Sequence, residues 1–274
     1  MATSILATGV DTVKAYQVAS IIETELHRLP GSEIAADDLV ALGARMLEIH
    51  GGREIAQRYL DWRRVKRMGR PLVLSLVGGS GVGKSTFATR LALRLGINRA
   101  VTTDAIREVL RTVIPDAVLP ELHVSTYEAI DAEAGTEGLS IFLRQSRAVA
   151  FACAAVAKRY IQERRSVIFE GVHLLPGLLS QQLKGLEEKP VVVELLLFLE
   201  EESLHQGRLA HRASSEPGRD GTRHLLHFKV IRRLQQELRR QAQRAGVSEF
   251  EISHPEGLTQ QVVENIVRAT EQPS

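Results

Sequence analysis

The sequence predicts an α/β fold, a parallel sheet with helices on both faces, preceded by a small all-helical N-terminal domain. Two observations support this prediction. From about residue 70 onward, short apolar segments alternate with amphipathic helical segments, a pattern typical of a parallel sheet covered on both faces. Residues 10–68 instead carry their apolar side chains at helical spacing. We therefore expect a helical domain over residues 1–68 and an α/β domain over residues 69–274.

The individual elements follow from the same periodicities. Before residue 68 we expect three helices, with Leu29-Pro30-Gly31-Ser32 and Gly51-Gly52 as the breaks between them. The expected strands of the second domain are 72–77, 99–102, 166–169, 191–199 and 247–252. The expected helices between them are 85–95, 104–113, about 140–164, 201–213, 222–245 and 257–270.

The composition limits the classes of protein to consider. Of the 274 residues, 44% are hydrophobic and 25% are charged, as in globular proteins, and a net charge of +2 gives no reason to expect nucleic-acid binding. The single cysteine, Cys153, excludes an internal disulfide framework and lies among apolar neighbours that favour burial. We recognise no membrane span and no signal peptide, so we expect a cytoplasmic protein without a membrane partner.

Residues 78–85 read Gly-Gly-Ser-Gly-Val-Gly-Lys-Ser and follow directly on the apolar run 72–77. A buried strand before this pattern and a helix after it are typical of a phosphate-binding loop, or P-loop. The glycines allow the backbone amides to face phosphate oxygens, Lys84 adds positive charge for the β- and γ-phosphates, and Ser85 offers a ligand to Mg²⁺. We expect ATP to bind at Gly78, Gly79, Ser80, Gly81, Val82, Gly83, Lys84, Ser85 and Thr86.

A basic run, Arg63-Arg64-Val65-Lys66-Arg67, ends the third expected helix. Cations at a helix C-terminus interact favourably with the helix dipole. We therefore interpret the run as a solvated helix end and not as a nucleic-acid patch.

Polar residues at the carboxyl ends of the next strands are candidates for the acceptor half of the site, because ligands bind at these ends in α/β sheets. Asp104 and Arg107 follow the second strand one helical turn apart, and Arg111 lies one turn further on the same face. They could hold an acceptor hydroxyl and an anionic group. Glu170 ends the third strand and is a candidate Mg²⁺ ligand or general base. A helix-capping role for Thr103 and Asp104 and a structural role for Glu170 are the alternatives.

Arginines flank a segment rich in Ser, Gly and Pro at residues 214–218. Arg208 and Arg212 lie four residues apart before it, and Arg219, Arg223 and His224 follow it. We predict a closing lid whose arginines, Arg208 and Arg212 among them, neutralise charge on the transferring phosphoryl group. A solvated basic helix is the alternative for each arginine taken alone.

With these residues in hand, the chain resembles the 2-phosphoglycerate kinase family. The resemblance covers most of residues 70–255, and its most specific parts are Glu170-Gly171-Val172-His173-Leu174-Leu175-Pro176-Gly177 and Leu122-His123-Val124-Ser125-Thr126-Tyr127. It implies a P-loop NTPase-type fold and ATP-dependent phosphorylation of a small phosphorylated acid. It also implies a substrate role for His123, Ser125, Tyr127 and His173, which residue chemistry alone leaves unassigned.

Residues 5–62 resemble an ATP-cone, a small helical nucleotide-binding regulatory module, at residues 9–26 and at Glu54-Ile55-Ala56-Gln57-Arg58-Tyr59-Leu60. The basic stretch that usually precedes the first helix of that module is missing from the pattern here. Docking on the kinase domain, or association into a homo-oligomer, is therefore the alternative to nucleotide binding.

The predicted function is transfer of a phosphoryl group from ATP·Mg²⁺ to a small anionic metabolite, with 2-phosphoglycerate and its product 2,3-bisphosphoglycerate as the favoured pair. Lys84, Asp104 and Glu170 are the expected catalytic residues, and Ser85 and Glu170 the expected metal ligands. A kinase for another phosphorylated acid, such as a phosphomevalonate, is the first alternative. A nucleotide-sensing regulatory P-loop protein is the second.

Overall fold

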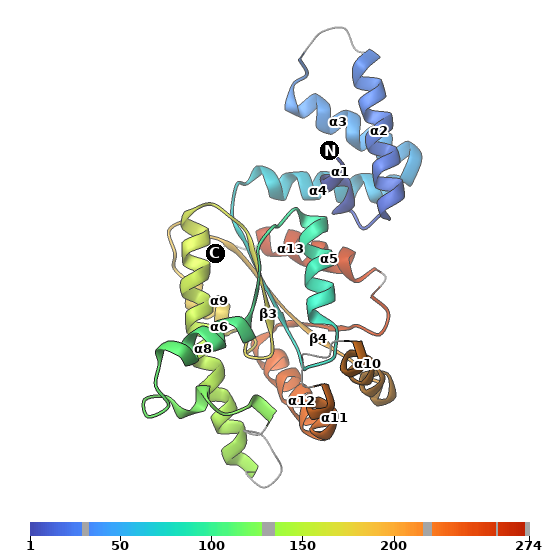
Figure 1. Cartoon of the computed structure of the whole chain (residues 1–274). Helices are drawn as coiled ribbons and strands as arrows, with labels where there is room; N and C mark the ends of the chain where they lie inside the picture. Colours follow the sequence, from blue (N-terminus) through green and yellow to red (C-terminus); the bar gives the residue numbers. More distant parts are fainter. Residues whose placement is uncertain (29–32, 128–134, 216–220, 256, 272–274) are drawn as a thin grey trace. The chain divides into compact units, whose positions relative to one another are not determined.

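The computed structural model describes the chain except for residues 29–32, 128–134, 216–220, 256 and 272–274 (Figure 1), and describes no side chains at 135–138, 215 and 221–223. The chain divides into two compact units. The helical unit comprises Met1–Arg70, Arg90–Asn98 and Glu256–Ser274, and the sheet unit comprises Pro71–Thr89 and Arg99–Pro255. The first segment of the helical unit thus ends at Arg70, two residues after the boundary expected at residue 68. The unit also includes two later segments that were expected in the α/β domain.

The sheet unit is built on five strands that all pair in parallel, in the order β2-β3-β1-β4-β5. The predicted α/β parallel sheet is therefore confirmed. The strands are β1 Leu72–Val77, β2 Ala100–Thr102, β3 Val167–Gly171, β4 Val191–Phe198 and β5 Ser248–Glu251. Val77 is in register with Gly171, and Glu170 with Thr102, so the carboxyl ends of β1, β3 and β2 meet at one edge of the sheet.

Helices lie on both sides of this sheet, with α8 and α9 on one side (Figure 1). Every residue of β1 is buried, and alternate side chains face opposite sides: Val73 and Val77 belong to a core cluster with residues of α8, α9 and α12. The helices of the unit are α6 Thr103–Val113, the short 3₁₀ helix η1 Pro120–Leu122, α8 Gly135–Gln162, α9 Leu178–Leu183, α10 Glu202–Ser215, α11 Gly221–Leu226 and α12 Phe228–Ala245.

Two details of the helices differ from the expectations. The single helix expected over 222–245 is interrupted at His227 and forms α11 and α12. The short helices η1 and α9, and α1 at Ala2–Leu6, were not expected at all. A helix of three to six residues is too short to produce a clear hydrophobic period.

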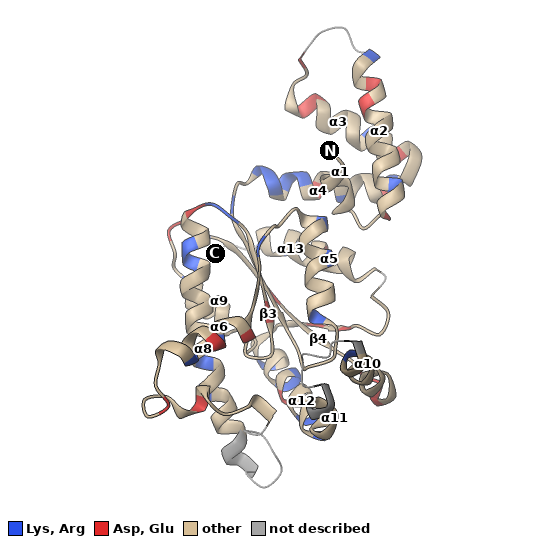
Figure 2. Cartoon of the chain, viewed as in Figure 1, with Lys and Arg blue, Asp and Glu red and all other residues tan. Residues whose placement is uncertain are grey.

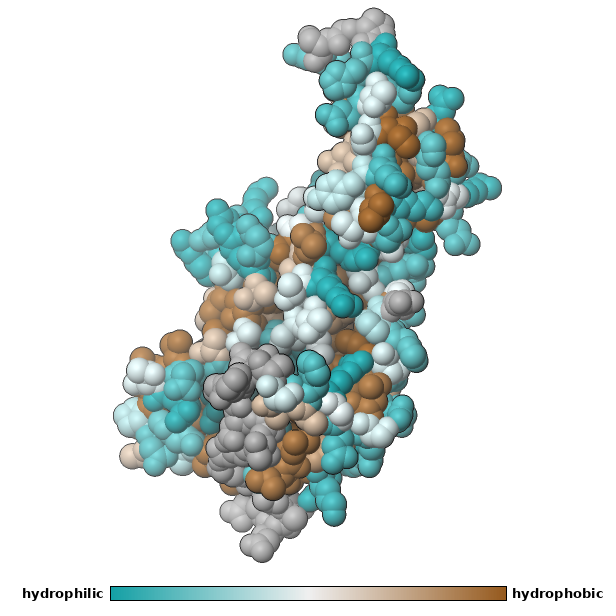
Figure 3. Space-filling model, turned by 45° about the vertical axis from the view of Figure 1, so that its right-hand side comes forward, coloured by the Kyte–Doolittle hydropathy of each residue, from teal (hydrophilic) through white to brown (hydrophobic). Residues whose placement is uncertain are grey.

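Helix α8 corrects the expectation that no segment is long and apolar enough to span a membrane. Its residues Leu139–Gln162 pass that test by length and composition. One face of α8 carries Val149, Cys153 and Ala157, which are completely buried in the core of the sheet unit. Cys153 is buried, as its apolar neighbours suggested, and burial raises the pKa of its thiol to about 12. Over the face drawn in Figure 3, hydrophobic residues are interspersed with hydrophilic ones.

The helical unit contains α1, α2 Thr12–Arg28, α3 Ala36–Gly51, α4 Arg53–Arg67 and α13 Leu258–Glu271, which confirms the three helices expected before residue 68. Its core includes Ile5, Ile22, Leu47 and Tyr59, all at most 1% exposed. A Cβ on Gly43 of α3 would lie 2.7 Å from the Tyr59 hydroxyl, so α3 and α4 pack closely there.

Helix α5, Lys84–Leu95, belongs to both units: residues up to Thr89 are in the sheet unit, and those from Arg90 are in the helical unit. Within the helical unit, the Arg94 guanidinium donates to the backbone carbonyls of Leu6 and Val10, at 3.2 and 3.0 Å. The last turns of α5 are therefore tied to the segment that follows α1.

Candidate active site

The P-loop connects the end of β1 to the first turn of α5. Gly81 and Gly83 have φ values of +80° and +102°, a backbone conformation that favours glycine. A Cβ on Gly81 would lie 2.5 Å from Leu209 Cδ2 of α10, so no side chain fits there. The loop thus has the glycine-dependent backbone that a phosphate cradle requires, and α5 begins directly after it at Lys84.

Three side chains lie together where α5 begins. The Ser85 hydroxyl donates to Glu170 Oε1 at 2.8 Å, and Lys84 Nζ donates to the Gly79 carbonyl at 2.7 Å. Glu170 is 6% exposed, at the end of β3. Burial lowers the pKa of Lys84, while the carboxylates of Glu170 and Asp104 raise it, so both carboxylates lie close enough to stabilise the ammonium. A hydroxyl and a carboxylate in contact form a donor set suited to Mg²⁺.

Two side chains of α10 contact backbone carbonyls of the P-loop and hold it in place. His205 is fully buried, and its Nε2 lies 2.7 Å from the Ser80 carbonyl. Arg208 donates to the Val82 carbonyl at 2.8 Å and to the Ile252 and Ser253 carbonyls at 3.0 and 3.3 Å. Arg208 was predicted as a lid arginine, and in this structure its guanidinium is occupied by backbone carbonyls that fix the loop. Its catalytic role stays a prediction.

Helix α6 carries the candidate acceptor residues. The cap is Thr102, whose hydroxyl accepts from the Ala105 amide at 3.1 Å, and not Thr103, which is buried. The Asp104 side chain is 84% exposed, so it is accessible to a substrate. Arg107 donates to the Val124 carbonyl at 2.6 Å, and its buried Nε has no partner among the described residues.

Arg111 lies near Arg107, and repulsion between the two guanidinium groups is one of the causes that lower the pKa of Arg107, after burial. Arg111 donates to Glu108 at 3.0 Å, and its Nε is also buried without a described partner. Two neighbouring cations with unused donors form an environment in which an anion is favourable.

His173 is 1% exposed and joins three elements. Its Nδ1 lies 3.1 Å from the Thr103 hydroxyl, and its Nε2 lies 3.0 Å from the Thr126 hydroxyl and 3.1 Å from Gln145 Oε1. Burial lowers its pKa to about 4, so it is neutral at pH 7, although Asp104 Oδ1 is 3.7 Å away. The predicted substrate contact stays a prediction, because what the structure shows is a histidine that holds the start of α6 beside β3.

Comparison with known proteins places this site in a family. A family described as "AAA domain" matches residues 73–241. A protein of Methanopyrus kandleri named 2-phosphoglycerate kinase is 33% identical over 97% of this chain and 82% of its own length. The chain belongs to the 2-phosphoglycerate kinase family.

Further relatives agree. Proteins of the same name from Pyrococcus horikoshii and Methanocaldococcus jannaschii are 32% and 37% identical, over 97% and 90% of this chain and 88% and 79% of their own lengths. Among solved structures, a gluconokinase from Sinorhizobium meliloti 1021 and a shikimate kinase from Acinetobacter baumannii are 16% and 15% identical. They cover 73% and 76% of this chain and 94% and 97% of their own, at TM-scores of 0.41 and 0.42, and add nothing to the family assignment.

The residues that the family resemblance selected in the segment 122–127 have different surroundings in the structure. His123 Nε2 lies 2.9 Å from the Ile114 carbonyl, and Ser125 is half-buried. Tyr127 has a hydrogen bond to the Ser80 side chain of the P-loop and an edge-on ring contact with His224, at 5.2 Å between centroids. Tyr127 therefore reaches the donor half of the site, although it was assigned to the acceptor half.

The predicted lid is described only in part. Arg212 is half-buried and lies close enough to Lys84 and Tyr127 to influence the pKa of each. Arg219 and the side chain of Arg223 lie outside the described residues. Arg212 is thus the predicted lid arginine that the described structure brings to the site.

Sequence reasoning missed several residues that shape this family's site. His205, Thr126 and Gln145 were not considered, and Gln235 and Arg232 of α12 hold the Leu199 carbonyl at the end of β4, at 2.8 and 2.6 Å. The resemblance includes Thr126 and Arg232 but implied no role for them, because the roles of all these residues depend on contacts between distant segments. A polar residue on the apolar face of an amphipathic helix, such as Gln235, is the available signal.

Among the described residues there is no group of three or more His, Cys, Asp or Glu side chains that could hold a metal ion. A P-loop Mg²⁺ does not need such a group, because phosphate oxygens and waters supply most of its ligands. Ser85 and Glu170 fit that smaller requirement.

Proposed function

We propose that this chain transfers the γ-phosphoryl group of ATP to the free hydroxyl of 2-phosphoglycerate. The contact between Ser85 and Glu170, next to Lys84, carries the proposal, because a hydroxyl and a carboxylate in contact suit Mg²⁺ and a neighbouring ammonium suits phosphate. The relatives named 2-phosphoglycerate kinase, at 32–37% identity, favour this acceptor.

In the proposed donor half, the loop Gly78–Thr86 binds the triphosphate of ATP, and Lys84 contacts the β- and γ-phosphates. Ser85 and Glu170 hold Mg²⁺ directly or through water. The ion, when bound, neutralises charge on the transferring group. Arg212 adds positive charge near Lys84, and His205 and Arg208 keep the loop in its binding conformation.

In the proposed acceptor half, Arg107 and Arg111 bind the carboxylate and phosphate of the acid. The hydroxyl oxygen forms a bond to the γ-phosphorus while the bond to the β,γ-bridging oxygen breaks, which releases ADP. The hydroxyl proton passes to a carboxylate, and Asp104 and Glu170 are both candidates. The exposure of Asp104 supports it as the group that contacts the acceptor, because Glu170 already accepts a hydrogen bond from Ser85.

A purified chain tests this assignment in an ADP-release assay with 2-phosphoglycerate, 3-phosphoglycerate, glycerate, phosphomevalonates and nucleosides, with the product identified by ³¹P NMR. We expect ADP release to depend on 2-phosphoglycerate and to yield a bisphosphorylated product. Dependence on a phosphomevalonate would overturn the acceptor and keep the kinase. Tight ATP binding without transfer to any of these acids would favour a regulatory protein.

Cytoplasmic location and self-association stay predictions. Acceptor turnover in the soluble fraction, and the mass of the purified chain in solution, are the measurements that bear on them.

A further inference from the structure

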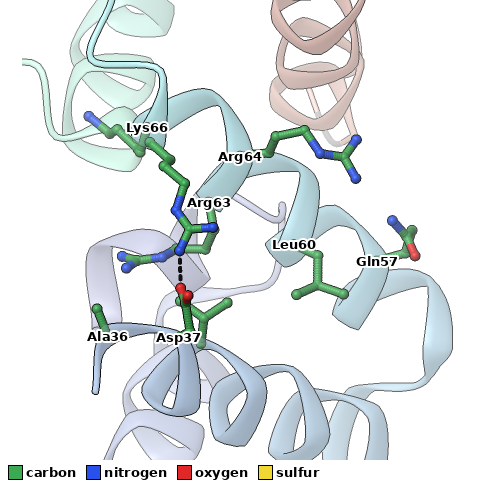
Figure 4. Close-up of a pocket in the computed structure, with 9 residues that line it drawn as sticks. Ala36, Asp37, Gln57, Leu60, Arg63, Arg64 and Lys66 are labelled. Atoms are coloured by element: carbon green, nitrogen blue, oxygen red, sulfur yellow. Dashed lines mark hydrogen bonds and ion pairs between the residues drawn. The ribbon is translucent and has the colours of Figure 1, made fainter. Parts of the chain in front are cut away.

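A cavity of about 570 Å³ lies in the helical unit, within the size range of small-ligand sites. It lies between the first turn of α3 and the last turns of α4 (Figure 4). Four of its lining residues are cationic and one is acidic, and the complete lining is Ala36, Asp37, Val40, Gln57, Leu60, Arg63, Arg64, Lys66 and Arg67.

The cations of this cavity are the basic run that the sequence suggested to be a solvated helix end, and Figure 2 shows them gathered near the end of α4. The helix dipole explains why cations end α4. It does not explain why they wall a cavity that α3 closes from the other side.

The positive charge of this cavity is only partly neutralised. Asp37 is engaged by Arg67, and Asp61, outside the cavity, lies 3.7 Å from Arg64. Arg63 donates to the Ser4 hydroxyl at 3.4 Å, and Lys66 lies 5.3 Å from the centre of the Trp62 ring. Within the described part of the chain, neither Arg63 nor Lys66 has a carboxylate partner.

The α3 side of the cavity adds to this positive potential. Ala35, the N-cap of α3, provides no side-chain hydrogen bond to the first-turn amides, and Ala36, Asp37 and Val40 of that turn line the cavity. The positive end of the α3 dipole and the cations of α4 therefore act on the same space. Partial burial lowers the pKa of Lys66, and the residue as a whole is exposed, so a ligand can reach it from solvent.

We infer that this cavity is a second binding site, separate from the P-loop, for a compact metabolite that carries phosphate and carboxylate groups. The lining does not favour a nucleoside. Its apolar members are aliphatic, and the nearby aromatic residues, Tyr59 and Trp62, are 0% and 1% exposed and offer no free ring face to a base. Recognition is therefore through the anionic groups.

The chain contains a single tryptophan, Trp62, and it lies under Lys66. Its fluorescence therefore reports on this cavity. The full chain is titrated with pyrophosphate, 2-phosphoglycerate and ATP while Trp62 emission is recorded, and binding of labelled pyrophosphate is measured in parallel by equilibrium dialysis. Both are repeated in the Lys84→Ala chain, in which phosphate binding at the P-loop is weakened.

Two pocket variants have opposite expected effects. Lys66→Gln should weaken pyrophosphate and 2-phosphoglycerate binding about tenfold, because it removes a charge-assisted contact. Asp37→Asn should strengthen binding several-fold, because it removes the single lining carboxylate and releases Arg67. A gain in affinity cannot result from misfolding. Arg53→Gln is the matched control, since it removes the same charge from an exposed position of α4 outside the lining.

Saturable binding that follows this pattern, and that Lys84→Ala leaves unchanged, supports the site. Equal affinity in wild type and Lys66→Gln overturns it, as does the lack of any Lys66-dependent binding of pyrophosphate or 2-phosphoglycerate at millimolar concentration. Binding of ATP alone, with neither of the compact anions, also overturns it, because the site would then recognise the nucleoside.

Discussion

Protonation of His173 should make the fold sensitive to acid. In the folded chain, His173 is protonated only when the pH approaches its lowered pKa of about 4. In the unfolded chain it is protonated around the ordinary pKa of 6.5. Stability therefore falls as the pH drops below 6.5, and the loss is complete below pH 4. The difference corresponds to roughly 3 kcal/mol in full, and to about 2 kcal/mol between pH 7.5 and pH 5.

The assay is urea unfolding followed by circular dichroism, from pH 7.5 to pH 5, for wild type, His173→Gln and His50→Gln. At pH 7.5, His173→Gln should be less stable, because it disturbs hydrogen bonds to Thr103 and Thr126. Toward pH 5 the difference in the free energy of unfolding between the variant and wild type should narrow by about 2 kcal/mol, since only wild type is destabilised by protonation of His173. His50 is exposed, so its variant should follow wild type. A gap that stays constant with pH would refute the reasoning.

Three further variants test the site. Lys84→Ala should reduce ATP turnover at least about a thousandfold, with an unchanged circular dichroism spectrum, while the exposed-lysine variant Lys229→Ala should keep it; equal turnover in both would exclude Lys84. Arg107→Ala should raise KM for the acidic acceptor by about tenfold or more with a smaller change in kcat, because it removes ground-state binding; an unchanged KM would place the anion elsewhere. Gly171→Ala should lower the free energy of unfolding by about 2 kcal/mol or more, because the new Cβ collides with the buried Thr103 side chain; a wild-type melting temperature would contradict this.

Most of the sheet unit could be predicted from the sequence because each strand is a short apolar run with strong local signals. β1 has the expected bounds, and the ends of the other strands shift by at most two residues. Local pattern also assigned Ser85 and Glu170 to one Mg²⁺ site, which stays a prediction; the two side chains are in contact, since parallel strands bring their carboxyl ends to one edge. The family resemblance named the substrate class, which the pattern alone did not.

What the sequence did not reveal depends on contacts between distant segments. Thr103 seemed a helix cap but is the buried partner of His173, seventy residues away. Arg208 suggested a mobile lid, yet its guanidinium is held by the carbonyls of Val82 and Ile252. The spacing of arginines along one helix cannot tell a mobile lid residue from one that fixes a loop, because the carbonyls that Arg208 contacts belong to other elements.

The composition of the helical unit bears on how the chain folds. Its members include α13, which packs on α4 and follows the sheet unit in the sequence. The helical unit is therefore assembled from segments that lie on both sides of the sheet unit in the sequence. Contacts between segments so far apart require closure of a long loop, so α13 should dock on α4 later than α3 and α4 pair with each other.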